Sequence, residues 1–213
     1  MNIIKQKVGI LLSAAIAGTF IGFGGMIFLM TSNPIVGVLL FSFGLFVILS
    51  TNLHLFTEKI CYLLSSNELN ALDMIIIWIG NFIGAYALAF VLSFTRYVVR
   101  LEEKACDICD VKYSDSYLSL FILGMLCNVF IFIAVDVYKN SKYELGKYLA
   151  IILAVMGFIL TGTEHCVADM FYFSMTRSFN IDSFTRLLII TSGNIIGGIN
   201  IRTLMSIKSY LLK

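Results

Sequence analysis

Charged residues are scarce in this chain. Asp, Glu, Lys and Arg make up 13% of its 213 residues, against about 25% in an ordinary soluble domain. None of the four lies between Lys7 and Glu58, and a soluble protein rarely exposes so long an uncharged surface to water. A stretch of this length fits two membrane-spanning helices joined at Asn33 and Pro34, where the helix is broken. We therefore expect an integral membrane protein of the all-α class.

Features that mark several other classes of protein are missing as well. The net charge of +2 is too small, and the basic residues are too scattered, to indicate nucleic-acid binding. The first apolar run is too long for a cleavable signal peptide. Cys106 and Cys109 form a single CxxC pair, which is half a zinc site at best and is better interpreted as a local disulfide or an incidental loop pair. We expect no metal site, no cofactor and no separate soluble domain.

Six apolar stretches follow one another along the chain, at residues 8–30, 35–57, 74–95, 116–138, 148–173 and 187–205. Most have about twenty residues, enough to cross about 30 Å of hydrocarbon as a helix. Their hydrophobicity is continuous rather than alternating, which favours helices over a β-barrel. Six spans place both termini on one side, which holds nine of the 15 Lys and Arg residues. The positive-inside rule then predicts cytoplasmic termini, in the cell (inner or plasma) membrane.

Two internal similarities indicate a repeat. The segment IGNFIGA (79–85) in the third stretch resembles SGNIIGG (192–198) in the sixth, and their small residues predict close helix packing. The second and fifth stretches are the two that polar residues interrupt, in LSTNLHLFT (49–57) and TGTEHCVADM (161–170). Two copies of three spans must run in opposite directions, so we expect inverted repeats at about 8–98 and 116–205 within a single channel domain, 1–213. Interrupted helices in matching positions are typical of a substrate site near the membrane midplane.

The fifth stretch carries the ionisable residues Glu164, His165 and Asp169 in apolar surroundings. On an ideal helix His165 and Asp169 share one face, together with Phe158 and Thr161. Glu164 would lie about 100° away and face a neighbouring helix rather than the same channel. A charged group at the bilayer centre costs about 2.5–3.5 kcal/mol, so such residues favour a role in a substrate pathway over one in helix packing alone.

The motifs GTEHCVADMFYF, FSFGL…LFT and GMLCN, with the paired Asn-Gly segments, resemble the formate/nitrite transporter family over essentially the whole chain. The resemblance implies an aquaporin-like fold of six helices with broken helices two and five. It implies a homopentamer in the lipid bilayer with one pore per protomer. The partners it implies are small monovalent anions of weak acids, such as formate, nitrite, hydrosulfide, acetate or lactate. It suggests no enzyme activity.

The resemblance also implies roles for individual residues. His165 matches the central pore histidine, Glu164 its acidic neighbour, and Thr57 the threonine that hydrogen-bonds this histidine. The remaining matches are Phe41 and Phe158 at the outer hydrophobic constriction; Leu45, Leu55 and Phe56 at the inner one; Lys112 in the outer vestibule; and Asn128 and Asn194 as pore-side asparagines. Two residues depart from the pattern: His54 stands where the family usually has Asp or Glu, and Asp169 replaces the usual Asn.

Two mechanisms for an anion remain open at this point. His165 either donates a proton to the anion or stabilises the anion as a cation or hydrogen-bond donor, and we expect Lys112 to attract anions to the outer mouth. Three other functions are also compatible with a six-span protein. They are an aquaporin-like channel for neutral solutes, a membrane enzyme using the Glu164 cluster, and a structural subunit. The two Asn-Pro-Ala motifs of aquaporins are missing, since Pro34 is the only proline.

Overall fold

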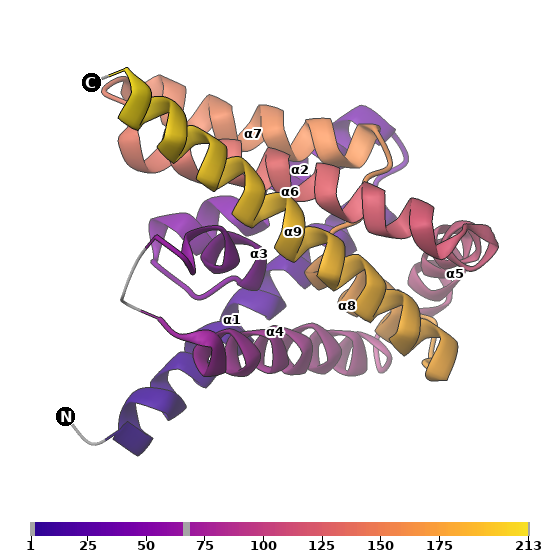
Figure 1. The fold of residues 1–213 in the computed structure, drawn as a ribbon. Helices are drawn as coiled ribbons and strands as arrows, with labels where there is room; N and C mark the ends of the chain where they lie inside the picture. The colour runs from indigo at the N-terminus through magenta and orange to yellow at the C-terminus, as the bar shows by residue number, and fades with distance from the viewer. Residues whose placement is uncertain (1–2, 66–68, 213) are drawn as a thin grey trace.

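The structure, a computed structural model, describes residues 3–65 and 69–212, and every regular element in this part of the chain is helical. Figure 1 shows the helices packed in one bundle, in which the start of α1 and the end of α9 lie at the same end. In chain order the elements are α1 (Ile3–Met30), α2 (Pro34–Ser50), α3 (Phe56–Lys59), the 3-10 turn η1 (Ile60–Tyr62), α4 (Ala71–Leu92), α5 (Val98–Ser114), α6 (Tyr117–Asn140), α7 (Glu144–Leu160), α8 (Cys166–Met175) and α9 (Ile181–Leu211).

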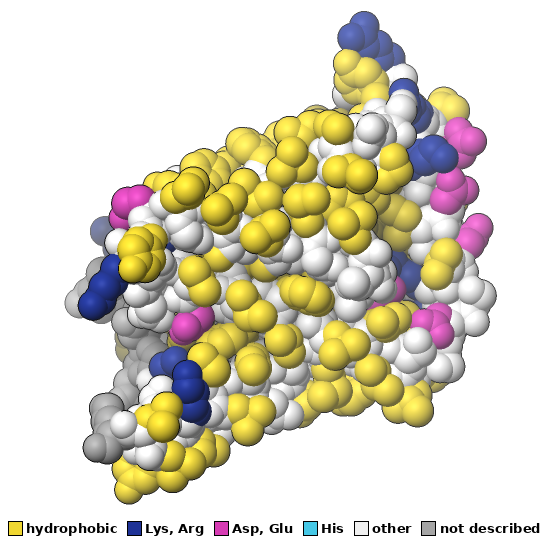
Figure 2. Space-filling view, turned by 90° about the horizontal axis from the view of Figure 1, so that it is seen from above, with side chains coloured by type: hydrophobic (Ala, Val, Ile, Leu, Met, Phe, Trp, Pro, Cys, Tyr) yellow, Lys and Arg dark blue, Asp and Glu magenta, His cyan; other side chains and the backbone are white. Residues whose placement is uncertain are grey.

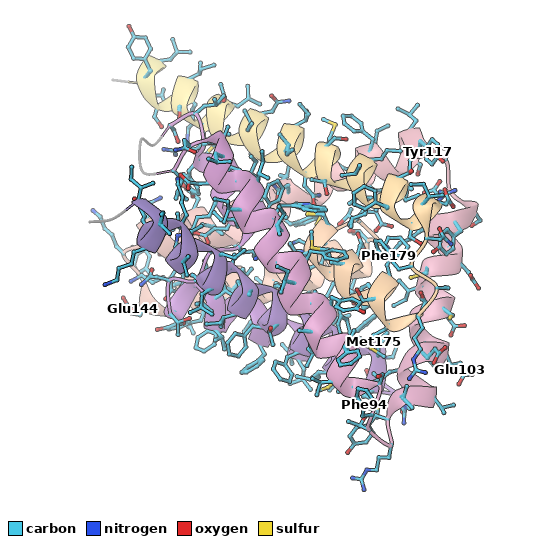
Figure 3. The ribbon with its side chains drawn as sticks, turned by 90° about the horizontal axis from the view of Figure 1, so that it is seen from below. Phe94, Glu103, Tyr117, Glu144, Met175 and Phe179 are labelled. Atoms are coloured by element: carbon cyan, nitrogen blue, oxygen red, sulfur yellow. The ribbon has the colours of Figure 1, made fainter. Side chains whose placement is uncertain are left out.

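Four of these helices, α1, α4, α6 and α9, are long and apolar enough to cross a membrane. They have 28, 22, 24 and 31 residues. Figure 2 shows apolar side chains across the middle of the molecule and most of the charged ones toward its two ends. Figure 3 places Glu144 at one of these ends and Glu103 at the opposite one. This distribution is that of a multi-pass membrane protein.

The helices α2 and α7 are shorter, with 17 residues each. Residues 51–55 and 161–165 follow them without helical structure, and α3 and α8 begin directly afterwards. Each of these two segments contains a residue with positive φ, Asn52 at 54° and Gly162 at 67°. Glycine adopts this conformation freely and asparagine more readily than most residues. The two polar interruptions of the sequence therefore coincide with helix ends.

A polar helix, α5, fills the connection between α4 and α6, outside the six apolar stretches. Cys106 and Cys109 lie on this helix as free thiols, so the CxxC pair is neither a disulfide nor part of a loop. Near its end, α5 packs on α8 and brings Lys112 into the interior, where only 6% of this residue is exposed. A polar helix thus brings a lysine next to the short helix α8.

The two halves of the chain pack in the same way, α1 against α4 and α6 against α9. The glycines of the repeated segments lie where these helices meet. A Cβ atom on Gly84 would lie 1.8 Å from the Ala15 carbonyl oxygen, and one on Gly197 would lie 2.2 Å from that of Met125. No larger residue fits at such a distance, so the close packing predicted from these segments is confirmed.

Candidate functional site

Asn194 of α9 holds the break between α7 and α8. Its Nδ2 donates to the carbonyl oxygens of Gly124 (2.7 Å) and Glu164 (2.9 Å), and its Oδ1 accepts from the Cys166 amide (2.9 Å). A break in a membrane helix frees backbone groups that must find partners inside the protein. One fully buried side chain therefore bonds backbone groups on both sides of His165 and links them to α6.

Asn81 of α4 does the same for the break between α2 and α3. Its Nδ2 donates to the carbonyl oxygens of Ala14 (2.7 Å) and His54 (3.0 Å), and its Oδ1 accepts from the Phe56 amide (2.8 Å). The carbonyl and the amide have the same positions relative to the short helix as those bound by Asn194. The two breaks are thus built from one hydrogen-bond pattern.

These breaks bring Thr57 and His165 together from opposite halves of the chain. The Thr57 Oγ1 atom lies 2.9 Å from His165 Nε2, and both residues are at most 2% exposed. His165 is also the N-cap residue of α8, where its Nδ1 accepts the Ala168 amide hydrogen at 3.2 Å. The imidazole is therefore held at both nitrogens.

The hydrogen-bond directions fix the protonation state of this ring. A backbone amide can only donate, so His165 Nδ1 carries no hydrogen in this arrangement. The remaining ring hydrogen is on Nε2 and is directed at the Thr57 oxygen. His165 is therefore a neutral imidazole with a single N–H, and a second proton on Nδ1 would break the bond that caps α8.

A pocket of about 220 Å³ opens beside this histidine. The Phe158 ring stacks on the imidazole with centroids 5.5 Å apart, and Phe41 packs edge-on against Phe158 at 6.0 Å. The side chains that matter for its chemistry are Phe41, Lys112, Phe158, Glu164, His165 and Asp169. Aromatic and ionisable groups thus share one small pocket.

The charged groups of this pocket form one cluster. Lys112 Nζ contacts the Glu164 carboxylate and lies 3.0 Å from Asp169 Oδ1. Burial lowers the pKa of the Lys112 ammonium, but the carboxylates of Asp169 and Glu164 outweigh this effect and raise it above its ordinary value. The lysine is therefore a cation neutralised by two carboxylates and not a free positive charge at the outer mouth.

The helix-face expectation for the fifth stretch is wrong in two respects, because the helix is broken at 161–165. Glu164 lines the same pocket as His165 and Asp169 instead of facing away from them. Thr161 lies outside this set; its hydroxyl donates to the Gly157 carbonyl oxygen at 2.7 Å. His165 contacts Thr57, Ala168 and Phe158, whereas Glu164 bonds Lys112.

The residues assigned to the inner constriction and the two asparagines are not among the residues that line this pocket. Leu45, Leu55 and Phe56 are buried at 2%, 0% and 4% exposure. Asn194 uses its amide to hold the break, as described above. Asn128 Nδ2 donates to the Asn194 carbonyl oxygen at 2.7 Å, and its Oδ1 has no hydrogen-bond partner among the described residues.

The segment after Thr57 carries a second charged cluster, which the sequence analysis did not single out. Glu58 is 2% exposed, and its Oε1 accepts from Lys59 (3.1 Å) and from Lys139 of α6 (2.9 Å). These lysines line a recess of about 280 Å³ together with Arg202 of α9. The feature of the sequence that indicates this cluster is Glu58 itself, a carboxylate at the end of an otherwise uncharged run.

His54 lies in the first break, between α2 and α3. Its Nδ1 lies 2.8 Å from the Ser13 hydroxyl oxygen, and the same oxygen accepts the His54 amide hydrogen at 3.1 Å. Within the described residues, no three His, Cys, Asp or Glu side chains group in a way that could hold a metal ion.

Comparisons with known proteins agree with this architecture. A family model described as "Formate/nitrite transporter" matches residues 2–207 of the chain. The formate channel FocA of Haemophilus influenzae is 26% identical over 200 residues, which cover 78% of this chain and 70% of that protein. The nitrite transporter NirC of Salmonella typhimurium is 24% identical over 218 residues, or 92% of this chain and 81% of that protein.

Solved structures share the fold. A pentameric formate channel with formate bound matches with a TM-score of 0.83 and 24% identity, over 98% of this chain and 99% of that one. An ion channel of the FNT family matches with a TM-score of 0.79 and 23% identity, over 95% and 90% of the two chains. The chain belongs to the formate/nitrite transporter family, whose members are channels and transporters and not enzymes.

Proposed function

We propose that this protein passes small monovalent anions of weak acids, such as formate, nitrite or hydrosulfide, across the cell membrane. The observation that carries the proposal is the position of His165, which bonds Thr57, stacks on Phe158 and lines the pocket. Family membership and the names of the relatives support the same substrate class.

The proposed architecture is one channel domain, residues 1–213, made of two inverted three-span repeats at about 8–98 and 116–205. The four long helices supply four spans, and α2 with α3 and α7 with α8 supply the two broken ones. The matching bonds of Asn81 and Asn194 support this pairing of the halves. By analogy with the similar pentameric formate channel, the assembly is a homopentamer. The larger number of Lys and Arg residues on the side of the termini supports a cytoplasmic location for both of them.

The physical task of such a pathway is to reduce the charge of the substrate. Moving an anion from water into a medium of ε ≈ 4 has an idealised Born cost of order 20 kcal/mol. A neutral acid loses only hydrogen bonds to water, which costs roughly a few kcal/mol. Phe41 and Phe158 are the apolar groups that the substrate meets beside His165, so the charge must be lowered or compensated at this pocket.

In this scheme His165 acts as a neutral hydrogen-bond donor. Its Nε2 hydrogen is directed at Thr57 Oγ1, a hydroxyl that can accept it and donate in turn. A substrate oxygen or sulfur that replaces either partner keeps the N–H satisfied. The pair Thr57 and His165 thus offers a passing solute a donor and an acceptor where the surroundings are apolar.

The test is flux through the purified chain in proteoliposomes. Formate, nitrite, hydrosulfide and chloride are compared, each at neutral pH and at about pH 5, where more of each weak acid is neutral. Flux of the weak-acid anions that rises on acidification and exceeds chloride flux is the expected result. His165→Phe should abolish this flux, whereas His165→Asn should keep a part of it. Wild-type vesicles no more permeable than empty ones would reject the proposal.

The neutralised state of Lys112 favours one second candidate, an aquaporin-like channel for neutral solutes. Two carboxylates surround this ammonium, so the pocket offers an anion no net positive charge. Stopped-flow permeability to water, urea and glycerol separates the two functions. High permeability to a neutral solute, with none to any anion of the panel, would identify this alternative.

A further inference from the structure

Asp169 is a buried carboxylate with one oxygen left over. Only 2% of the residue is exposed. Its Oδ1 lies 3.0 Å from Lys112 Nζ, whereas its Oδ2 has no hydrogen-bond partner among the described residues. Asp169 also lines the pocket beside His165. Buried polar atoms without a partner are rare in folded proteins and point to a function.

The charges around this oxygen do not balance. Lys112 supplies one positive charge, and Glu164 and Asp169 supply two negative charges when both are ionised. His165 is neutral for the reasons given above. The fully ionised pocket would therefore carry a net charge of −1 and repel the anions that the proposed function requires. One added proton makes the pocket neutral.

The hydrogen-bond pattern indicates where this proton lies. Glu164 accepts a hydrogen bond from the Lys112 ammonium, which favours its ionised form. Two neighbouring carboxyl groups in one buried site commonly hold one proton between them, because two negative charges would repel each other. Among the described residues, Asp169 Oδ2 is the fully buried carboxylate oxygen of this pocket that accepts no bond, so a hydrogen placed there interrupts no existing contact.

Other titratable groups near Asp169 are poorer proton donors. Charged side chains of α1, α4 and α9 do not line this pocket in the described part of the chain. The groups that interact with Asp169, apart from Lys112 and Glu164, are Cys109, Cys127, Cys166 and Tyr172. Thiols and phenols ionise near pH 8.5 and 10 in water, far above a carboxylic acid.

We propose that Asp169 is the proton donor of the outer pocket: Oδ2 carries a proton in the resting protein and gives it to the entering anion. In this step the O–H bond at Oδ2 breaks and a bond forms between the proton and an oxygen or sulfur of the anion. The products are the neutral acid and an ionised Asp169, which remains paired with Lys112. A proton from bulk water then restores the acid. This role rests on the proposed function, and it places the donor on Asp169 instead of His165.

Infrared spectroscopy of the full chain in lipid tests the resting protonation state without any transport. At neutral pH the wild type should show the C=O stretch of a protonated carboxylic acid, shifted by D₂O. Asp169→Asn, which introduces the residue usual in the family, should remove this band. Asp169→Glu should retain it, and the exposed-site control Asp110→Asn should leave it unchanged. A band that survives Asp169→Asn, or that only Glu164→Gln removes, overturns the assignment.

Transport then tests the donor role. Formate flux through Asp169→Asn should fall at least about tenfold at neutral pH, since a positioned acid contributes strongly to proton transfer. At about pH 5 the loss should be small, because bulk formic acid supplies the neutral species. Asp169→Glu should keep the wild-type pH profile if it elutes as the same oligomer. Wild-type flux in Asp169→Asn at both pH values rejects the donor role alone, whereas a wild type that passes no anion rejects the proposed function.

Discussion

Asn81 and Asn194 make the same three hydrogen bonds at the two broken helices. Each side-chain nitrogen donates to a backbone carbonyl of a neighbouring long helix and to a backbone carbonyl in the break. Each side-chain oxygen accepts from the backbone N–H two residues after that second carbonyl. Both N–H groups of each side-chain amide are used in these bonds. Asparagines at these positions therefore hold the two helix breaks in place.

Replacing Asn194 with alanine should destabilise the protein strongly. The change leaves the Cys166 amide and the carbonyls of Gly124 and Glu164 without this partner in the interior. At about 1 kcal/mol or more for each bond, we expect the free energy of unfolding to fall by about 2–4 kcal/mol. Thermal unfolding in detergent measures the effect, and Asn140→Ala at the exposed end of α6 is the control. Equal melting temperatures for the two variants would contradict the bonding scheme.

The helix contact at Gly84 predicts a steric effect, for which a second glycine provides a control variant. Gly84→Ala places a Cβ atom 1.8 Å from the Ala15 carbonyl oxygen, so α1 and α4 must move apart. We expect a loss of about 1–3 kcal/mol or more. Gly9→Ala on the same α1 helix meets nothing within 4 Å and should stabilise by up to about 1 kcal/mol. Melting temperatures that shift in the same direction would argue against this contact.

The bond between Thr57 and His165 predicts a hydroxyl requirement. Thr57→Val keeps the volume but leaves the Nε2 hydrogen of His165 without its acceptor in a buried site. An unsatisfied group of this kind costs about 1–3 kcal/mol, so anion flux should change about tenfold or more. Thr57→Ser retains the hydroxyl and should remain close to wild type. The measurement is formate flux in proteoliposomes, and equal flux in Val and Ser variants would remove Thr57 from the mechanism.

Lys112 predicts a stability effect with a defined pH range. Its pKa in the folded protein lies above the ordinary value of 10.5, because Asp169 and Glu164 outweigh the effect of burial. A raised pKa means that this stabilisation is complete below about pH 10.5 and is lost only as the pH rises through the folded value. Lys112→Met should therefore destabilise by about 3–5 kcal/mol at any pH near neutrality, since the buried, ionised Glu164 loses its cation.

A double replacement checks the cause of this loss. In the Lys112→Met background, adding Glu164→Gln and Asp169→Asn removes both acidic groups, and with them the unpaired charge. Much of the lost stability should return, because the penalty comes from unpaired buried charge. Chemical or thermal unfolding of the three proteins in the same detergent measures it. A triple variant that is less stable than Lys112→Met alone would show that charge pairing is not the reason.

Much of the molecule follows from the sequence because the bilayer restricts the choices. A run of fifty residues without Asp, Glu, Lys or Arg has few stable arrangements other than membrane helices. The paired segments around Asn81 and Asn194 marked the helix contacts. The two polar interruptions marked the helix ends. The family resemblance also brought His165, Thr57, Phe41 and Phe158 to one place, and the structure has these residues in contact.

The charge state of the pocket was decided by tertiary structure alone. On an ideal helix the Glu164 side chain would face away from His165. The five residues after Leu160 are not helical, however, and Glu164 lines the same pocket as His165. Lys112 comes from a polar helix that lies outside the apolar stretches, and only packing brings it between Glu164 and Asp169. Helix formation follows from local hydrophobicity and backbone bonding, whereas the number of charges that meet in one buried pocket depends on contacts between distant segments.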